Sequence, residues 1–125
     1  MPNISKTTAT KVQETPPFTE HTDDLDGYTV NFVSLRVDMD LAPLLKGLPD
    51  DRCQCPHWGY QFAGTHTVSY ADHDEVIEAG SAFYMAPGHT ARATAGSEFL
   101  VFSPADQLRE TEAAMAANAK ALQDA

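Results

Sequence analysis

The chain has 125 residues, 42% of them hydrophobic, which suffices for one domain with a core and is too few for two. Its 18 acidic residues outnumber 8 basic ones, and the net charge of −10 disfavours binding to nucleic acid or to an anionic membrane. No apolar run approaches the roughly 18 residues of a membrane-spanning helix, and the N-terminus lacks the apolar stretch of a signal peptide. We therefore expect a soluble, cytoplasmic protein.

The beginning of the chain has no regular hydrophobic pattern. Residues 1–17 are rich in Thr, Lys, Pro and Glu and are expected to form a disordered tail. Residues 18–27 are acidic and turn-like, and we expect them to lead into a domain that spans residues 18–103. From Tyr28 to Val37 apolar and polar side chains alternate, which predicts a half-buried strand with a bulge near Val33.

Short segments separated by turns fill the middle of the chain. After an apolar connection at residues 41–47 and a turn at residues 48–52, the expected strands are residues 57–63, 67–70, 75–78, 82–85, 90–94 and 98–102. Glycine-bearing turns at this spacing predict an all-β sandwich or antiparallel barrel. Connections this short leave no room for the crossovers that parallel strands need.

The C-terminal segment, residues 104–125, has the pattern of an amphipathic helix. Ser103 suits the N-cap and Pro104 the first helical position. Leu108, Met115 and Leu122 then recur every seven residues among alanines and glutamates. An apolar stripe this thin needs packing, so we expect the helix to lie on the barrel or on a partner subunit.

Residues that can bind metal are concentrated at two points. Cys53, Cys55 and His57 alternate just before a predicted strand, and His89 follows a Pro-Gly turn. An extended segment would put the first three on one face, and a set of thiolates and imidazoles favours zinc. Four ligands would make a closed structural site, whereas three would leave a position open for water.

A structural interpretation of the same residues stays open. Cys53 and Cys55 lie too close in sequence for an unstrained disulfide and could be small buried apolar side chains. His57 could bond a backbone carbonyl, and His89 could be an exposed turn residue. The remaining histidines, His21, His66 and His73, have no partner pattern and carry no functional prediction.

The aromatic residues around His57 allow two arrangements. Trp58, Tyr60 and Phe62 share the strand face opposite His57 and Gln61. If His57 points into the barrel, the aromatic trio points outward and needs cover from the C-terminal helix or from a second subunit. If the trio points inward, the barrel holds a dry aromatic cavity for a small molecule. The candidate ligand-binding residues are Trp58, Tyr60, Gln61 and Tyr84.

The order of the glycine-containing turns resembles that of the cupin superfamily. Gly64 follows an apolar strand, Gly80 opens a β-turn-β unit, and Pro87-Gly88 stands near the end of that unit. The resemblance covers about residues 28–103, and the run Cys-Pro-His-Trp-Gly-Tyr looks like that of small single-domain bacterial cupins. It implies an antiparallel cupin-like β-barrel of the double-stranded β-helix type, often dimeric, so a homodimer is expected.

The resemblance does not extend to the cupin metal ligands. Counting from Gly64 places His57 where the family has a glutamate and places the two cysteines near its paired histidines. Counting from Gly80 places Ala91 where the family has its last histidine. The three-histidine, one-carboxylate centre therefore cannot be carried over, although the resemblance adds iron, nickel and manganese to zinc as candidate metals.

Two functions remain in competition. The first is a binding protein that holds a small molecule in the barrel, with or without a metal ion. The second is a metal-dependent enzyme of oxygenase or isomerase type that uses Cys53, Cys55, His57 and His89. Fold analogy alone does not establish catalysis, and we expect the first function.

Overall fold

The computed structural model describes residues 3–124, which fold into two antiparallel sheets and one long helix. In chain order the elements are β1 (Lys11–Glu14), β2 (Phe18–Leu25), β3 (Tyr28–Leu35), β4 (Met39–Asp40), the short 3₁₀ helices η1 (Ala42–Leu45) and η2 (Pro49–Asp51), β5 (His57–Ala63), β6 (His66–Ser69), β7 (Asp74–Ile77), β8 (Ser81–Met85), β9 (Thr90–Ala93), β10 (Glu98–Pro104) and α1 (Ala105–Asp124). None of the described helices has the length and apolar character that crossing a bilayer requires.

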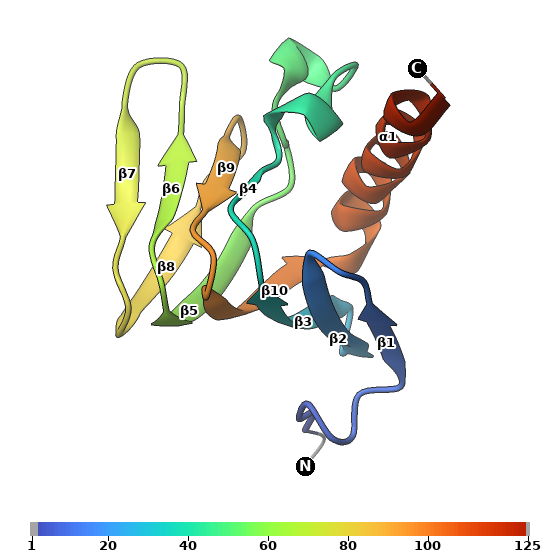
Figure 1. Cartoon of the computed structure of the whole chain (residues 1–125), viewed down its shortest axis with the longest axis vertical. Coiled ribbons are helices and arrows are strands. Elements are labelled where there is room, and N and C mark those ends of the chain that lie inside the picture. The colour runs from blue at the N-terminus through green and yellow to red at the C-terminus, as the bar shows by residue number, and fades with distance from the viewer. Residues whose placement is uncertain (1–2, 125) are drawn as a thin grey trace.

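The larger sheet has the strand order β1-β2-β3-β10-β5-β8, and the smaller has the order β4-β9-β6-β7. Every strand pair is antiparallel, as the short connections predict. Figure 1 shows the smaller sheet rising from one end of the larger one and α1 standing over its other end. The predicted all-β class with a C-terminal helix is thus confirmed.

Burial alternates along β5 as a two-sided strand requires. Trp58, Tyr60 and Phe62 are exposed, whereas Gln61 between them is fully buried. Gly59 lies on the buried face opposite Phe83, and a Cβ atom there would come within 2.4 Å of the Phe83 ring and 2.2 Å of the Leu100 carbonyl oxygen. Glycine is needed here because Phe83 and the Leu100 backbone, on the two adjacent strands, occupy the space that a side chain would fill.

The turn after β5 also depends on glycine. Gly64 has a φ of +76°, which glycine adopts without strain, and a Cβ atom would lie 2.2 Å from the Ser97 side-chain oxygen. Gly64 is one of the residues on which the cupin resemblance rests. The fold therefore accounts for that residue through backbone geometry and close packing, with no reference to a ligand.

The chain differs from the expected boundaries at both ends. Ser103 and Pro104, expected as the cap and first residue of the helix, are the last residues of β10, and α1 begins at Ala105. Lys11–Glu14 is not disordered but pairs with β2, which itself replaces the expected acidic lead-in. Neither strand has a buried face, since the residues of both are half-buried or exposed. Their sequences therefore show no alternation of apolar and polar side chains that would predict a strand. Residues 1, 2 and 125, at the ends of the expected tail and helix, lie outside the described residues.

Helix α1 packs against η1 and contacts β10 and β3. Leu108 is buried with Leu45 and both cysteines, and Met115 packs on the same cluster. The Asn118 amide donates hydrogen bonds to the carbonyl oxygens of Leu44 and Lys46, at 2.7 and 2.8 Å. Burial and these bonds fix the helix beside the cysteine segment, in keeping with the expectation that it lies on the barrel.

Candidate metal centre

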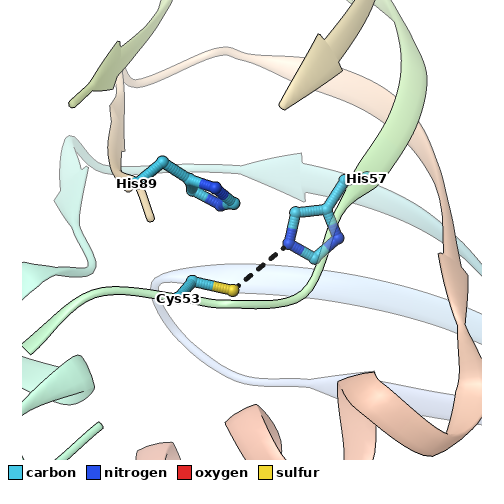
Figure 2. A group of neighbouring side chains, drawn as sticks. All are labelled: Cys53, His57 and His89. Carbon is cyan, nitrogen blue, oxygen red and sulfur yellow. Dashed lines mark hydrogen bonds between the residues drawn. The ribbon is translucent and has the colours of Figure 1, made fainter. Parts of the chain in front are cut away.

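Three of the four predicted metal ligands meet in the structure. Cys53 lies between η2 and β5, His57 begins β5, and His89 lies between β8 and β9. One donor atom from each residue lies within 4.8 Å of the other two, and Figure 2 shows the three side chains pointing toward one another. The grouping is compact enough for one ion to contact all three donors.

The backbone holds two of these donors side by side. Cys53 and His89 form an isolated β-bridge. The Cys53 N–H donates to the His89 carbonyl oxygen at 2.8 Å, and the Gly88 N–H donates to the Cys53 carbonyl oxygen at 2.8 Å. Segments separated by more than thirty residues are therefore fixed against each other before any side chain is considered.

Hydrogen bonds also orient both imidazoles. His89 Nδ1 lies 2.6 Å from the Ala86 carbonyl oxygen, and since a carbonyl only accepts, Nδ1 carries the proton. In the neutral ring, Nε2 then has a free lone pair. His57 Nδ1 lies 2.7 Å from Ser103 Oγ, while its Nε2 lies 3.5 Å from Cys53 Sγ. Partners of this kind set the tautomer and direction of metal-binding histidines.

Burial keeps these imidazoles uncharged. Loss of solvent, reinforced by the neighbouring His89 and His66, lowers the pKa of His57 to about 3. Burial also lowers the pKa of His89, against a smaller opposing effect of its bond to Ala86. Both rings are therefore neutral at pH 7, which is the form that coordinates a metal.

Cys53 is a protonated thiol in the metal-free protein. It is 4% exposed, and burial raises its pKa, although a contact with Thr111 works in the opposite direction. Thr111 Oγ1, from helix α1, lies 3.5 Å from Cys53 Sγ. A metal ion would have to displace the thiol proton.

Cys55 lies outside the group that the structure brings together. Its Sγ points to the Pro56 carbonyl oxygen at 3.4 Å, and it packs in the cluster with Leu45 and Leu108. Burial, with Cys53 and Glu112 nearby, raises its pKa to about 12. The predicted common face fails because the chain bends at Cys55 instead of staying extended. For this thiol the structural interpretation fits.

The four candidate ligand-binding residues do not share a surface. Trp58, Tyr60 and Tyr84 are exposed on the outer face of the larger sheet, whereas Gln61 is fully buried on the inner face. Gln61 donates to the Ala63 carbonyl oxygen at 2.9 Å, and its Oε1 lies 3.3 Å from His66 Nδ1. The arrangement is thus the one in which His57 points inward and the aromatic trio points outward.

Two cavities of about 330 and 290 Å³ lie elsewhere. Asp38, Asp40 and Arg92 line the first among others, while Glu20, Arg109 and Glu112 are among the residues lining the second. Neither includes a candidate metal ligand or a candidate ligand-binding residue. They give no support to an aromatic cavity inside the barrel.

Sequence reasoning missed the residues that support the cluster. Ser103 was expected only as a helix cap, and Thr111 and Tyr70 carried no prediction. Ser103 lies two residues after the buried Val101 on β10 and therefore on the same face of the strand, a periodicity that could have placed it on the inner face with His57. His66, also given no role, is 5% exposed and lies against the Phe99 ring at 4.7 Å.

Comparison with known proteins identifies the fold. No family model matches the chain. No curated protein matches it either.

Solved structures do match. A point mutant of Bacillus subtilis oxalate decarboxylase matches with a TM-score of 0.57 and 12% identity over 81% of this chain and 28% of that one. The polyketide cyclase RemF from Streptomyces resistomycificus matches with a TM-score of 0.54 and 15% identity over 83% of this chain and 79% of that one. A cupin-2 domain protein from Shewanella frigidimarina, at a TM-score of 0.46 and 11% identity over 68% of this chain and 78% of that one, is too distant to add to the argument.

The chain spans little more than a quarter of the decarboxylase and most of the cyclase. Identities this low show a shared fold and nothing about substrates. The order of strands, the glycine turns and these likenesses agree with one another. This chain has a cupin-like fold.

Proposed function

We propose that this protein binds one metal ion through Cys53, His57 and His89. The observation that carries the proposal is the convergence of three buried or half-buried donor atoms within 4.8 Å of one another. Two neutral imidazoles and one thiol suit zinc best, since zinc takes nitrogen and sulfur ligands in tetrahedral geometry. Iron, nickel and manganese are the alternatives suggested by the cupin resemblance.

Three protein donors leave one position of a tetrahedral ion for water or a small molecule. We therefore propose that the small molecule expected from the sequence binds at the metal and not among the exposed aromatic residues. A Lewis-acidic ion would supply an attachment point for an oxygen, nitrogen or sulfur atom of the ligand. Burial of Cys53 and His89 limits that ligand to a small group at its point of contact.

The test is the metal content of protein purified without chelator or affinity tag. We expect near-stoichiometric metal in the wild type and its loss in Cys53→Ser and His89→Ala. Cys55→Ser is the matched control, because it removes the neighbouring buried thiol and should retain the metal. Cobalt substitution should also give sulfur-to-cobalt absorption that disappears in Cys53→Ser and persists in Cys55→Ser. A wild type that binds neither zinc nor cobalt would contradict the proposal.

Metal-dependent catalysis, of oxygenase or isomerase type, is the alternative function. It needs the same ion, so the metal assay decides first whether it can be pursued. Turnover of a small molecule by the metal-loaded protein, absent in Cys53→Ser, would then favour it.

We also infer that two copies of the chain associate through the aromatic face, defined as the exposed residues Tyr28, Trp58, Tyr60, Phe62 and Tyr84. The Trp58 ring centroid lies 5.2 Å from that of Tyr84 and 6.2 Å from that of Tyr28, and the Tyr60 and Phe62 centroids are 5.1 Å apart. Helix α1 gives them no cover, because Leu108 and Thr111 contact Cys53 on the inner side. Two copies of net charge −10 repel except where uncharged surfaces meet, and this face consists of uncharged side chains.

A cytoplasmic location and the lack of a nucleic-acid or membrane partner stay predictions. They are supported by the acidic balance of the chain and by its reduced, unpaired cysteines.

A further inference from the structure

His89, like Cys53, lies outside the named strands. It lies in the connection between β8, which ends at Met85, and β9, which begins at Thr90. Its ring is held by the bond from Nδ1 to the Ala86 carbonyl oxygen at 2.6 Å. The direction in which Nε2 points therefore depends on how firmly Ala86 is held.

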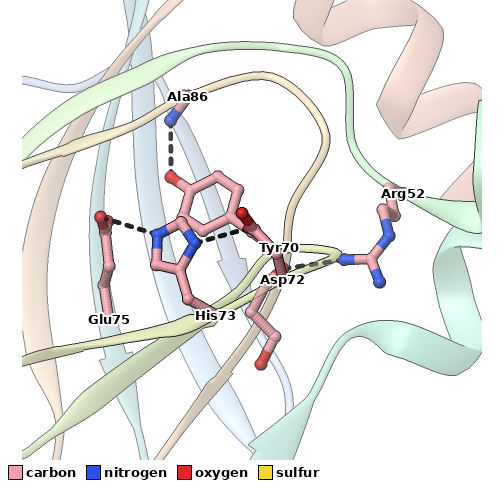
Figure 3. A network of polar contacts seen from close by, with 7 residues as sticks. Arg52, Tyr70, Asp72, His73, Glu75 and Ala86 are labelled. Carbon is pink, nitrogen blue, oxygen red and sulfur yellow. Dashed lines mark hydrogen bonds and ion pairs between the residues drawn. The ribbon is translucent and has the colours of Figure 1, made fainter.

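Ala86 is held by the side chain of Tyr70. The Ala86 N–H donates to the Tyr70 hydroxyl oxygen at 2.8 Å, as Figure 3 shows. Tyr70 directly follows β6, in the smaller sheet, so this bond ties the β8–β9 connection to a neighbouring hairpin. A chain of contacts thus runs from the Tyr70 hydroxyl through Ala86 to the imidazole of His89.

The Tyr70 ring is itself fixed. It stacks on the His73 ring with centroids 4.9 Å apart and planes 18° from parallel. His73 is held by Asp72 at 2.7 Å on one ring nitrogen and by Glu75 at 3.2 Å on the other. The Tyr70 N–H also donates to the His73 carbonyl oxygen at 2.8 Å, which closes the turn.

The same end of β6 also supports the cysteine segment. Arg52, which directly precedes Cys53, donates a hydrogen bond from Nη1 to the Ser69 carbonyl oxygen at 3.0 Å (Figure 3). Ser69 and Tyr70 therefore contact the two segments whose backbones form the Cys53–His89 bridge.

We propose that Tyr70 is a positioning residue for the metal centre, acting through Ala86 to fix the tautomer and orientation of His89. The proposal rests on the proposed function, because it assigns Tyr70 a role in metal affinity. It goes beyond that function by placing a determinant of affinity on a hairpin that contributes no ligand. Outer-shell partners of metal-binding histidines commonly change affinity about 10- to 100-fold when removed.

Tyr70→Phe is the informative substitution. It keeps the ring and its stacking on His73 but removes the acceptor of the Ala86 N–H. We expect affinity for Co(II) or Zn(II), measured by competition with a chromogenic chelator, to fall by up to about 10-fold, the lower end of the range for direct partners of metal-binding histidines, because Tyr70 acts through Ala86. Tyr28→Phe, which removes an exposed hydroxyl from the aromatic face, is the matched control and should leave the affinity unchanged.

A second measurement does not depend on metal. In the metal-free protein, nitrogen NMR shifts should show His89 protonated at Nδ1 in the wild type and a mixture of tautomers in Tyr70→Phe. A purely structural role would lower the melting temperature and leave both affinity and tautomer as in the wild type, and that result would overturn the proposal.

His73→Ala is the second variant if Tyr70→Phe does not fold. It removes the ring stacked on Tyr70 and keeps the Tyr70 hydroxyl, so the tautomer and the affinity should shift in the same direction but by less. No shift in either would overturn the proposal.

The two proposals can fail separately. A wild type that binds no metal would contradict the proposed function and, with it, a role of Tyr70 in metal affinity. The tautomer measurement would then show only whether Tyr70 orients the His89 ring. Metal binding that survives Tyr70→Phe undiminished, with Nδ1 still protonated, would contradict the positioning role only.

Discussion

His57 Nδ1 and Ser103 Oγ lie 2.7 Å apart, and this contact turns the opposite nitrogen of the ring toward Cys53. The serine is completely buried on β10, so water cannot replace it as a hydrogen-bond partner. Loss of the hydroxyl would leave His57 free to rotate and would leave Nδ1 unsatisfied in a buried place.

Ser103→Ala should therefore weaken metal binding by about 10- to 100-fold. Ser97→Ala is the matched control, since Ser97 is equally buried but bonds Thr94 away from the cluster. Competition titrations on both variants measure the difference. Equal losses in the two variants would mean that the effect of Ser103 is on general stability.

Metal binding should release one proton. Burial raises the pKa of Cys53 above its ordinary value of 9.0, so the thiol is protonated between pH 7 and 8, where His57 and His89, whose pKa values are lowered, are already neutral. Affinity should then rise about tenfold per pH unit across this range. Calorimetric titrations in buffers of different ionisation enthalpy count the protons. Release of none would show that the thiol is not a ligand.

His66 should make the metal-free protein less stable in acid. Burial, with His89 nearby, lowers its pKa from 6.5 to about 4. Between these values the unfolded chain takes up a proton that the folded chain does not, so stability is full above pH 6.5 and is lost as the pH falls toward 4. His66 should lower the free energy of unfolding by about 1.4 kcal/mol for each pH unit in this range.

Urea unfolding of the wild type and of His66→Gln at pH 6.5, 5.5 and 4.5 measures this contribution. The slope of the free energy of unfolding against pH should be smaller in the variant by about that amount. Identical slopes would show that His66 becomes protonated in the folded protein as readily as in the unfolded chain.

Trp58→Glu should convert a dimer into a monomer. The substitution puts a carboxylate at the centre of the aromatic face, where in a two-fold interface it would meet the same face of its partner. Light scattering after size exclusion gives the mass of each species. Val76→Glu, another exposed apolar residue, lies on β7 in the smaller sheet and should not change the mass. A monomeric wild type would contradict the proposed association.

Much of the fold could be predicted from local pattern. Residues 57–63 are a strand with the expected bounds, because alternation of polar and large apolar side chains matches the two sides of a sheet. The glycine turns and the C-terminal helix are equally local signals. In contrast, β1 and β2 carry polar side chains that are largely half-buried or exposed, so their pairing depends on neighbours that the local pattern does not reveal.

The candidate site could be predicted only in part. His57 and His89 were singled out through their chemistry and their place beside strands, and the structure brings them together with Cys53. Cys55 was included because an extended segment was assumed, yet the chain bends there. Ser103, Thr111 and Tyr70 could not be singled out, because their roles depend on which segments lie next to one another in three dimensions.

The backbone bridge between Cys53 and His89 has a consequence for how the ion would be gained and lost. In a zinc finger the ion assembles its own ligands, and the chain unfolds without it. Here ordinary peptide hydrogen bonds between the two backbones hold the Cys53 and His89 donors side by side. Such a chain can exchange its ion with the surrounding pool while its shape persists, so occupancy would follow availability instead of dictating folding.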